Sequence, residues 1–238
     1  MSAALAIAQR ELASFFRLPI GWVVIALYLV LTGLVFGMWT LRPGEPASMQ
    51  SLFHLSGWLM IFVAPAISMR LISEELRAGT IEPLMTAPVS DWQIIIGKYL
   101  GGVGFLVAML APTLLFVVTL EIFSNPDYGP IVAGYVGLLA LGMLYLAVGL
   151  LASALTSNQV VAFLGTLFFL LFMRIATTQG AAFLGPPLDR PLYALSVDLR
   201  MLDFARGVID TGHLVFFIAA SVWFTALAVV ALESRRWR

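Results

Sequence analysis

The sequence has 238 residues, of which 61% are hydrophobic and only 11% charged, and its 13 basic and 13 acidic side chains cancel. Soluble domains are roughly one-quarter charged, so this chain has too few charges to cover a water-soluble globule. Zero net charge argues against nucleic-acid binding. Because there is no cysteine and there are only two histidines, disulfides, thiolate metal sites and histidine-rich metal sites are excluded. We therefore predict an integral membrane protein.

Six apolar runs are long enough to cross a membrane, which takes about 20 residues in a helix. They cover residues 20–41, 52–72, 95–120, 131–155, 160–176 and 213–232. Lipid offers no partner to unpaired backbone groups, so runs of this length predict helices. We expect an all-α membrane protein with six transmembrane helices in a single domain, 1–238. The first run is too long for a signal peptide and lacks a cleavage site, so it is expected to be a retained span.

The distribution of Lys and Arg predicts the orientation of these spans. With six spans both termini lie on one side, and that side carries Arg10, Arg17, Arg70, Arg77, Lys98, Arg235, Arg236 and Arg238. The other side carries Arg42, Arg174, Arg190, Arg200 and Arg206. We therefore predict that both termini are cytoplasmic.

The segment before the first span, 1–19, has the pattern of an amphipathic helix. Leu5, Ala8, Leu12 and Phe15 recur at helical spacing, and Arg10 falls on another face. A helix of this kind lies in the membrane interface with its cations toward anionic headgroups. The alternative is an ordinary cytoplasmic cap on the first span.

The connection between the second and third spans, 70–98, contains several helix starts and stops. Residues 73–78 extend a helix that includes Glu74 and Glu75, and Gly79 supplies a stop. Thr80 can cap a new short helix. Ser90 and Gln93 form a capping-box pattern that opens the next helix.

The predicted short helix carries Ile81 and Leu84 beside Glu82. A small amphipathic helix projecting from the bundle is the kind of element that a groove on a partner protein binds. The alternative is a solvated hairpin between two spans.

The outer segment, 179–212, begins with helix breakers and then becomes periodic. Its apolar stripe comprises Leu195, Leu199, Leu202 and residues 208–209, and its polar stripe comprises Ser196, Arg200, Asp203, Arg206 and Asp210. Arg200/Asp203 and Arg206/Asp210 have the spacing of helical ion pairs. We predict an amphipathic helix that acts as a lid or gate. A surface helix that only closes the bundle is the alternative.

The sequence lacks the residues that would supply its own energy source or catalysis. Gly97-Lys98 is followed by Tyr99 rather than Ser or Thr, so there is no phosphate-binding loop. No charged residue falls near the middle of a predicted span, as an ion-coupled carrier would need. No catalytic constellation is recognisable. We therefore expect a non-enzymatic chain that binds no cofactor or metal and is driven by a partner.

The loop 70–98, with the sequence RLISEELRAGTIEPLMTAPVSDWQIIIGK, closely resembles the characteristic loop of type-2 ABC exporter permeases. The start of the sequence resembles the gliding-motility (Gld) and nitrous-oxide-maturation (Nos) branch of that family, at Arg10-Glu11-Leu12, 15–16 and 19–21. The run 204–210, FARGVID, is similar to the same branch.

This resemblance implies an N-terminal interfacial elbow helix (1–19), a cytoplasmic coupling-helix loop (73–92) and an outer gate segment (179–212). The coupling residues would be Glu74, Glu75, Gly79, Thr80, Ile81, Glu82 and Leu84. The gate residues would be Arg200, Asp203, Phe204, Arg206 and Asp210.

The resemblance further implies a permease subunit in the bacterial cytoplasmic (inner) membrane that couples ATP hydrolysis to export. A separate cytoplasmic ABC ATPase would bind the ATP and Mg²⁺, and a second permease copy or homologue would complete a dimer. An auxiliary envelope protein is a further candidate partner. The alternative function is a membrane anchor or assembly scaffold of an envelope or motility complex that transports nothing.

Overall fold

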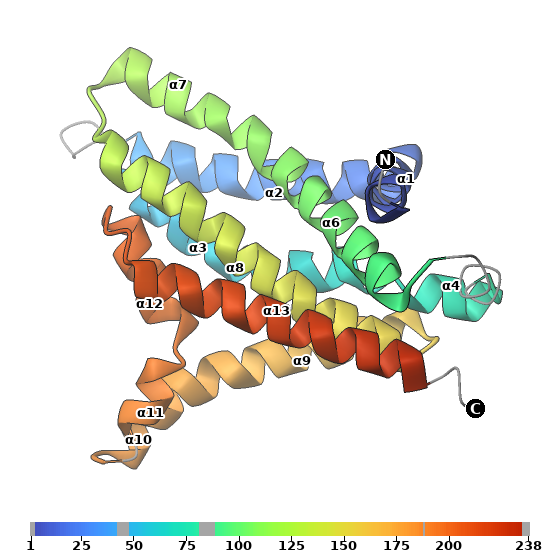
Figure 1. Ribbon diagram of the computed structural model, residues 1–238. Helices are drawn as coiled ribbons and strands as arrows, with labels where there is room; N and C mark the ends of the chain where they lie inside the picture. Colours follow the sequence, from blue (N-terminus) through green and yellow to red (C-terminus); the bar gives the residue numbers. More distant parts are fainter. Residues whose placement is uncertain (1–2, 42–47, 81–88, 188, 235–238) are drawn as a thin grey trace.

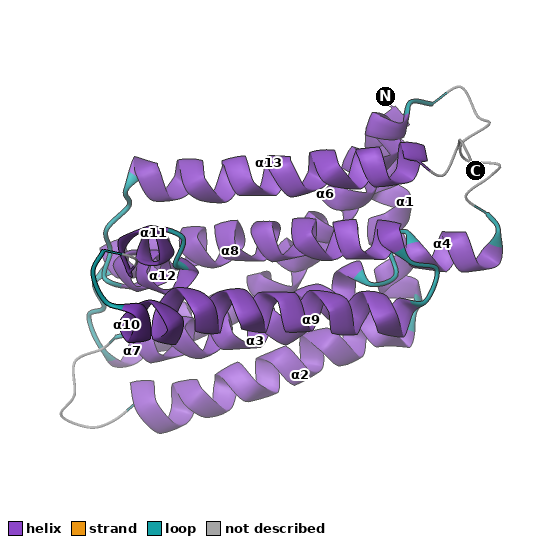
Figure 2. Cartoon of the chain, turned by 90° about the horizontal axis from the view of Figure 1, so that it is seen from below, coloured by secondary structure: helices purple, strands orange, loops and turns teal. Residues whose placement is uncertain are grey.

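The computed structural model describes residues 3–41, 48–80, 89–187 and 189–234, and in these ranges the regular structure is entirely helical (Figures 1 and 2). The first half contains α1 (Ala3–Arg17), α2 (Pro19–Val35), η1 (Phe36–Thr40), α3 (Gln50–Ser68), α4 (Ser73–Ala78), α6 (Asp91–Leu110), η2 (Ala111–Thr113) and α7 (Leu114–Phe123). The second half contains α8 (Tyr128–Leu155), α9 (Gln159–Ile175), η3 (Ala176–Gly180), α10 (Ala181–Leu184), α11 (Asp189–Ala194), α12 (Val197–Ala205) and α13 (Thr211–Glu233).

Six helical stretches are long and apolar enough to cross a membrane, which confirms the predicted six-span, all-α class. They are Pro19–Thr40, Gln50–Ala78, Asp91–Phe123, Tyr128–Leu155, Gln159–Leu184 and Thr211–Glu233. The fifth extends furthest beyond its prediction, because η3 and α10 continue α9 through the small and polar residues after Ile175.

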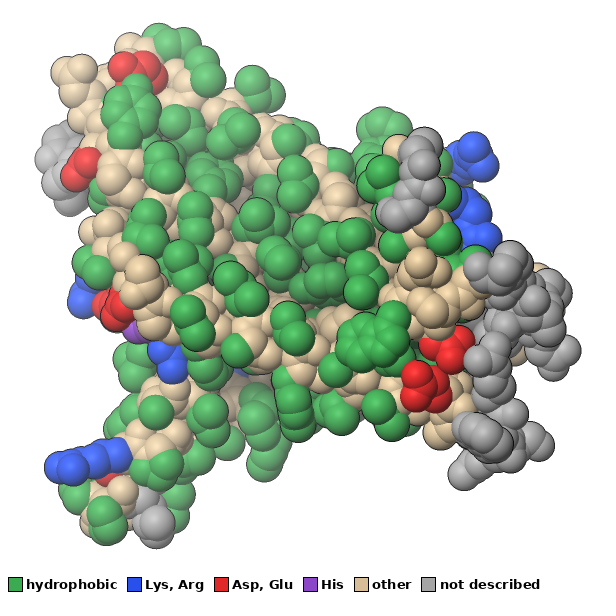
Figure 3. Space-filling model, viewed as in Figure 1, with side chains coloured by type: hydrophobic (Ala, Val, Ile, Leu, Met, Phe, Trp, Pro, Cys, Tyr) green, Lys and Arg blue, Asp and Glu red, His purple; other side chains and the backbone are tan. Residues whose placement is uncertain are grey.

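Different helices form the two ends of the bundle. The start of α1, all of α4 and the end of α13 lie at one end, the terminal side, whereas α11 and α12 lie at the other, the distal side (Figures 1 and 2). Hydrophobic side chains cover the face between them, and charged side chains gather toward the two ends (Figure 3). This distribution is the one expected of a protein whose middle lies in hydrocarbon.

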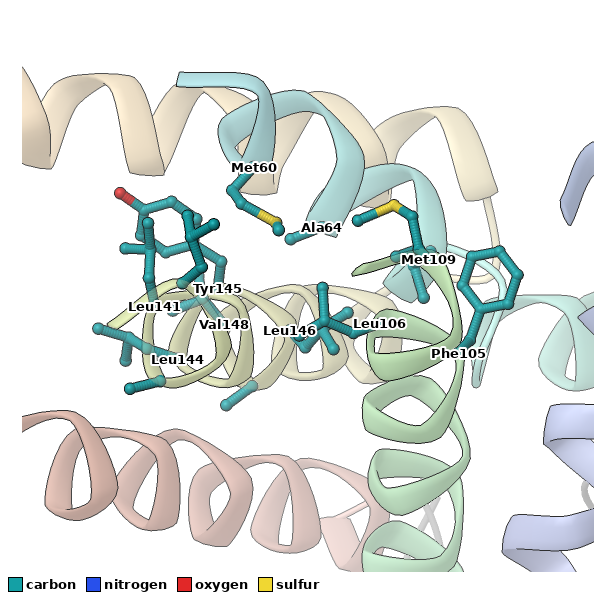
Figure 4. Close-up of a cluster of buried hydrophobic side chains, with 14 of the residues drawn as sticks. Met60, Ala64, Phe105, Leu106, Met109, Leu141, Leu144, Tyr145, Leu146 and Val148 are labelled. Carbon is teal, nitrogen blue, oxygen red and sulfur yellow. The ribbon is translucent and has the colours of Figure 1, made fainter. Parts of the chain in front are cut away.

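The core of the bundle is built around α8, which packs against α3, α6, α9, α12 and α13. Figure 4 shows its centre, where Leu141, Tyr145 and Leu146 of α8 meet Met60 of α3 and Leu106 of α6. Because α8 touches most of the other spans, it fixes the positions of the functional segments at both ends.

The outer segment differs from its prediction. The helix α12 ends at Ala205, and the chain turns through Gly207 at a φ of 92°, so Arg206 and Asp210 do not share a helix. Leu195, Leu199 and Leu202 of the predicted apolar stripe are 53%, 46% and 44% exposed. The buried positions are instead Ser196, Met201, Phe204 and Ala205. In a membrane the surroundings are themselves apolar, so hydrophobicity does not mark the side that faces the core.

Candidate functional site

The helix α4 is fixed in place by the end of α8. Ser153 Oγ accepts hydrogen bonds from the backbone N–H groups of Ile72, at 3.0 Å, and Ser73, at 2.9 Å. It also donates to the carbonyl oxygen of Met69, at 3.0 Å. These groups lie in the turn between α3 and α4, where helical hydrogen bonding is interrupted. One buried hydroxyl therefore sets the direction in which α4 leaves the second span.

The end of α4 is formed by Gly79, as predicted. Its φ is 69°, a left-handed conformation that glycine adopts without steric cost. The backbone N–H of Thr80 donates to the carbonyl oxygen of Glu75 at 3.0 Å and closes the turn. The predicted coupling residues Ile81, Glu82 and Leu84 lie outside the described residues. The capping box of Ser90 and Gln93 is confirmed at the start of α6.

A ring of four charges connects α4 to two other helices at the terminal side. Lys98 Nζ of α6 lies 2.9 Å from Glu11 Oε1 of α1 and 2.9 Å from Glu75 Oε1 of α4. Arg10 Nη2 of α1 lies 3.2 Å and 2.9 Å from the same two oxygens. We call Arg10, Glu11, Glu75 and Lys98 the four-charge cluster. Its positive and negative groups alternate around the ring, and its net charge is zero.

Three of the four side chains are largely buried, whereas that of Arg10 is 54% exposed. The side chain of Lys98 is 1% exposed, and those of Glu11 and Glu75 are 13% and 18% exposed. Removing one partner of a buried pair costs about 3–5 kcal/mol, because the remaining charge is left uncompensated. The three helices are therefore held in one arrangement. Displacement of α4 would move the Glu75 carboxylate relative to the Lys98 ammonium group, which lies on a membrane span.

Two glycines of α6 allow α1 to approach closely enough to form the cluster. A Cβ atom on Gly97 would lie 2.8 Å from the carbonyl oxygen of Ala4, and one on Gly101 would lie 2.6 Å from Glu11 Cβ. The Gly-x-x-x-Gly spacing at 97–101 thus serves a contact within the chain. The elbow helix lies directly against the third span.

Glu74 belongs to a second ion pair beside the cluster. Its Oε2 lies 3.1 Å from Arg70 Nε, and the Arg70 guanidinium lies 5.3 Å from the centre of the Phe15 ring of α1. Two of the three predicted acidic coupling residues, Glu74 and Glu75, are therefore linked to arginines at the terminal side. Thr80 is exposed.

The predicted gate residues lie together at the distal side but do not form the expected pairs. In the described ranges, neither Arg200/Asp203 nor Arg206/Asp210 is an ion pair. Arg200 donates to the carbonyl oxygen of Ala194, and its guanidinium lies 4.0 Å from the centre of the Phe216 ring. Burial lowers the pKa of Arg200, and Asp210 opposes that shift.

The remaining gate residues anchor α12 and begin α13. Phe204 is fully buried, and a Cβ atom on Gly137 of α8 would lie 2.7 Å from Phe204 Cβ. Asp203 Oδ2 lies 3.8 Å from His213 Nε2. Asp210 caps α13 by accepting a hydrogen bond from Gly212 N at 2.7 Å, and Arg206 is exposed.

Sequence reasoning overlooked the role of Lys98 and Glu11. A lysine in the second turn of an apolar span requires a counter-charge, and a glutamate in an amphipathic helix just before the first span could supply it. It also missed the pairing of Arg174 with Asp198, whose atoms Nη2 and Oδ1 lie 2.6 Å apart. The sequence separation of these partners hides both contacts.

The bundle and its charged ends define a polytopic helical membrane protein with an N-terminal helix packed on the third span and a short helix, α4, at the end of the second span. A model of the ABC-2 family transporter proteins matches residues 40–185, more than half of the chain, and the chain belongs to that family. Such proteins are non-catalytic transmembrane permease subunits of ABC transporters, and ATP hydrolysis takes place in a separate partner. The predicted type-2 permease class and the absence of enzyme activity are thereby confirmed.

The chain is also similar to two curated proteins, both named "Probable multidrug ABC transporter permease YbhR", from Escherichia coli strain K12 and from Escherichia coli O157:H7. Each is 29% identical over 100 residues, which cover 42% of this chain and 27% of the relative. The match thus leaves most of each relative uncovered.

Proposed function

We propose that the chain is the permease subunit of an ATP-driven exporter in the bacterial cytoplasmic membrane, with the terminal side in the cytoplasm. Membership of the ABC-2 family supports the permease role, and the bias of Lys and Arg toward the terminal side supports the orientation. ATP and Mg²⁺ are assigned to a cytoplasmic ABC ATPase, and a second permease copy or homologue completes the assembly.

The four-charge cluster is the observation that carries this proposal. The ATPase would bind the segment formed by Glu74, Glu75, Gly79, Thr80, Ile81, Glu82 and Leu84. When ATPase closure displaces that segment, Glu75 moves with it and pulls on Lys98 of α6 and Arg10 of α1. The movement thereby reaches the third span and the elbow helix together.

At the distal side, Arg200, Asp203, Phe204, Arg206 and Asp210 are proposed to form the gate. Phe204 anchors α12 on α8, which runs from the distal to the terminal side. A change in the packing of α8 at its terminal end would therefore reach the gate through one rigid helix.

Two finer assignments rest on the sequence. The residues 10–12 and the run 204–210 support membership of the gliding-motility and nitrous-oxide-maturation branch, and an auxiliary envelope protein is a proposed partner on that basis. The word "multidrug" in the name of the Escherichia coli relatives favours drugs as the first substrates to assay.

Gly79 provides the test, because proline cannot adopt its φ of 69° whereas asparagine tolerates the left-handed region. The tagged full chain would be purified from membranes with its bound proteins, and ATP hydrolysis by the complex would be measured. We expect Gly79→Pro to insert normally but to lose about tenfold or more of the ATPase activity that co-purifies with the wild type. Gly79→Asn should keep it.

Two results would contradict the proposal. Recovery of no ATPase with the wild-type chain would favour a membrane scaffold without transport. Equal ATPase activity in the Gly79→Pro and wild-type complexes would show that the loop does not couple the two proteins.

A further inference from the structure

A cavity of about 850 Å³ lies on the distal side, between α3, α8, η3 and α12. Its lining includes Leu141 and Tyr145 of α8 and Gly57 and Trp58 of α3, together with the charged side chains of Arg174 and Asp198. In Figure 1, α9 and α13 diverge toward this side of the bundle. The volume falls in the range of small-molecule sites, about 300–1,000 Å³.

Two opposite charges stand side by side in this cavity. Arg174 Nη2 lies 2.6 Å from Asp198 Oδ1, and the Arg174 guanidinium lies 3.6 Å from the centre of the Trp58 ring. The Arg174 side chain is 11% exposed and that of Asp198 is 30% exposed. The pair uses one oxygen of the carboxylate and one nitrogen of the guanidinium, so each group keeps hydrogen-bonding capacity toward the cavity.

The cavity borders the distal ends of the first two spans, because Trp39 of η1 and Gln50 and Ser51 at the start of α3 line it. Arg174 stands in the last turn of α9, and the fifth span continues beyond it to Leu184. The neighbouring side chains of Phe172 and Ile175 are 63% and 56% exposed, as expected of residues that face lipid. Tryptophan and cationic side chains are both enriched near the membrane interface.

We propose that this cavity binds a zwitterionic phospholipid of the distal leaflet, with its phosphate on Arg174 and its primary ammonium group on Asp198. Net charge decides between lipid classes. Pockets for anionic lipids are basic, whereas here the arginine is matched by a carboxylate that would repel a second anion. A primary ammonium can donate hydrogen bonds to Asp198, which a quaternary ammonium cannot. The acyl chains would extend along the exposed apolar side chains of α9.

The site is independent of the transport function, because binding requires neither ATP nor a partner protein. The full chain would be purified in detergent and mixed with equal concentrations of phosphatidylethanolamine, phosphatidylcholine and phosphatidylglycerol. Native mass spectrometry would then count the lipids retained. We expect one phosphatidylethanolamine to be retained about fivefold or more over each of the other two lipids.

Substitutions of Arg174 and Asp198 test the role of each charge separately from that of the cavity volume. Arg174→Gln should lower retention of all three lipids, whereas Asp198→Asn should remove the preference for phosphatidylethanolamine over phosphatidylglycerol. Arg190→Gln is the matched control, because Arg190 is an exposed arginine of α11 outside the cavity. It should leave retention unchanged.

Gly57 allows the cavity to be filled without altering either charge. A Cβ atom there would make ordinary contacts with Leu141 and Met201, at 3.8 Å and 4.0 Å, so alanine fits. Gly57→Ala should retain the lipid, and the bulkier Gly57→Leu should reduce its retention about fivefold or more. Unfolding temperatures of the same samples distinguish loss of the site from loss of the fold.

Three outcomes would overturn the proposal. These are equal retention of the three lipids by the wild type, preference for phosphatidylglycerol, and undiminished phosphatidylethanolamine retention in both Gly57→Leu and Asp198→Asn.

Discussion

Lys98 Nζ lies 2.9 Å from Glu11 Oε1, although 87 positions separate the two residues in the chain. One residue belongs to a membrane span and the other to the elbow helix, and Lys98 is almost fully buried. The amphipathic α1 is therefore packed into the bundle. Because Lys98 also contacts Glu75, whatever moves α4 acts on both helices.

Lys98→Met should destabilise the folded protein by about 3–5 kcal/mol, because two carboxylates then share Arg10 alone. Thermal unfolding in detergent, compared with wild type, measures the effect. Arg77→Gln is the control, since Arg77 is an exposed cation of α4. The double variant Lys98→Met/Glu11→Met removes one charge of each sign and should recover much of the loss. A double variant no more stable than Lys98→Met would contradict the cluster's role.

Gly101→Val should push α1 away from α6, because even a Cβ atom at this position would lie 2.6 Å from Glu11 Cβ. The chain has no cysteine, so the separation can be followed with the pair Leu12→Cys and Gly104→Cys and a short thiol cross-linker. We expect cross-linking to fall several-fold. Gly165→Val is the matched control, since open space surrounds Gly165. Unchanged cross-linking in Gly101→Val would argue against close packing of these helices.

Ser153→Ala should leave the buried N–H groups of Ile72 and Ser73 without their acceptor, at a cost of about 1–3 kcal/mol. The expected result is faster hydrogen exchange of these two amides, with little change elsewhere in α3. Thr225→Val removes a hydroxyl that only donates to the carbonyl oxygen of Ser221 in its own helix and should be milder. Similar exchange in both variants would show that Ser153 does not hold α4.

Stability should depend on pH through Asp198. Burial raises the pKa of its carboxyl above the ordinary 3.8, and Arg174 and His54 only partly offset this. The folded state therefore binds the proton more tightly than the unfolded state, and the stability contributed by the protonated form is lost as pH rises from about 4 through the folded pKa. As the pH rises through this window, the free energy of unfolding of the wild type should fall relative to that of Asp198→Asn. Thermal unfolding of both proteins at pH 4 to 7 tests this prediction. A wild type that becomes more stable than Asp198→Asn as the pH rises would contradict it.

Much of this architecture followed from local sequence. The six spans follow from continuous apolar runs of about 20 residues. The stop at Gly79 and the capping box of Ser90 and Gln93 depend on residues within a few positions of one another. The outer segment was harder, because Leu199 and Leu202 face outward while Phe204 is buried. In lipid, an apolar side chain has no reason to prefer the core, so periodicity does not reveal which face packs.

The sequence by itself determined that this is a six-span membrane protein, and its loop after the second span resembles that of type-2 ABC permeases. Its scarcity of charge, 13 basic and 13 acidic side chains, was enough for the first conclusion. Only the tertiary structure decided which of those charges pair: Lys98 pairs with Glu11 and Glu75, and Arg174 pairs with Asp198. The reason is physical, because a charge in a membrane protein must find a partner, and chain folding alone brings distant partners within 3 Å.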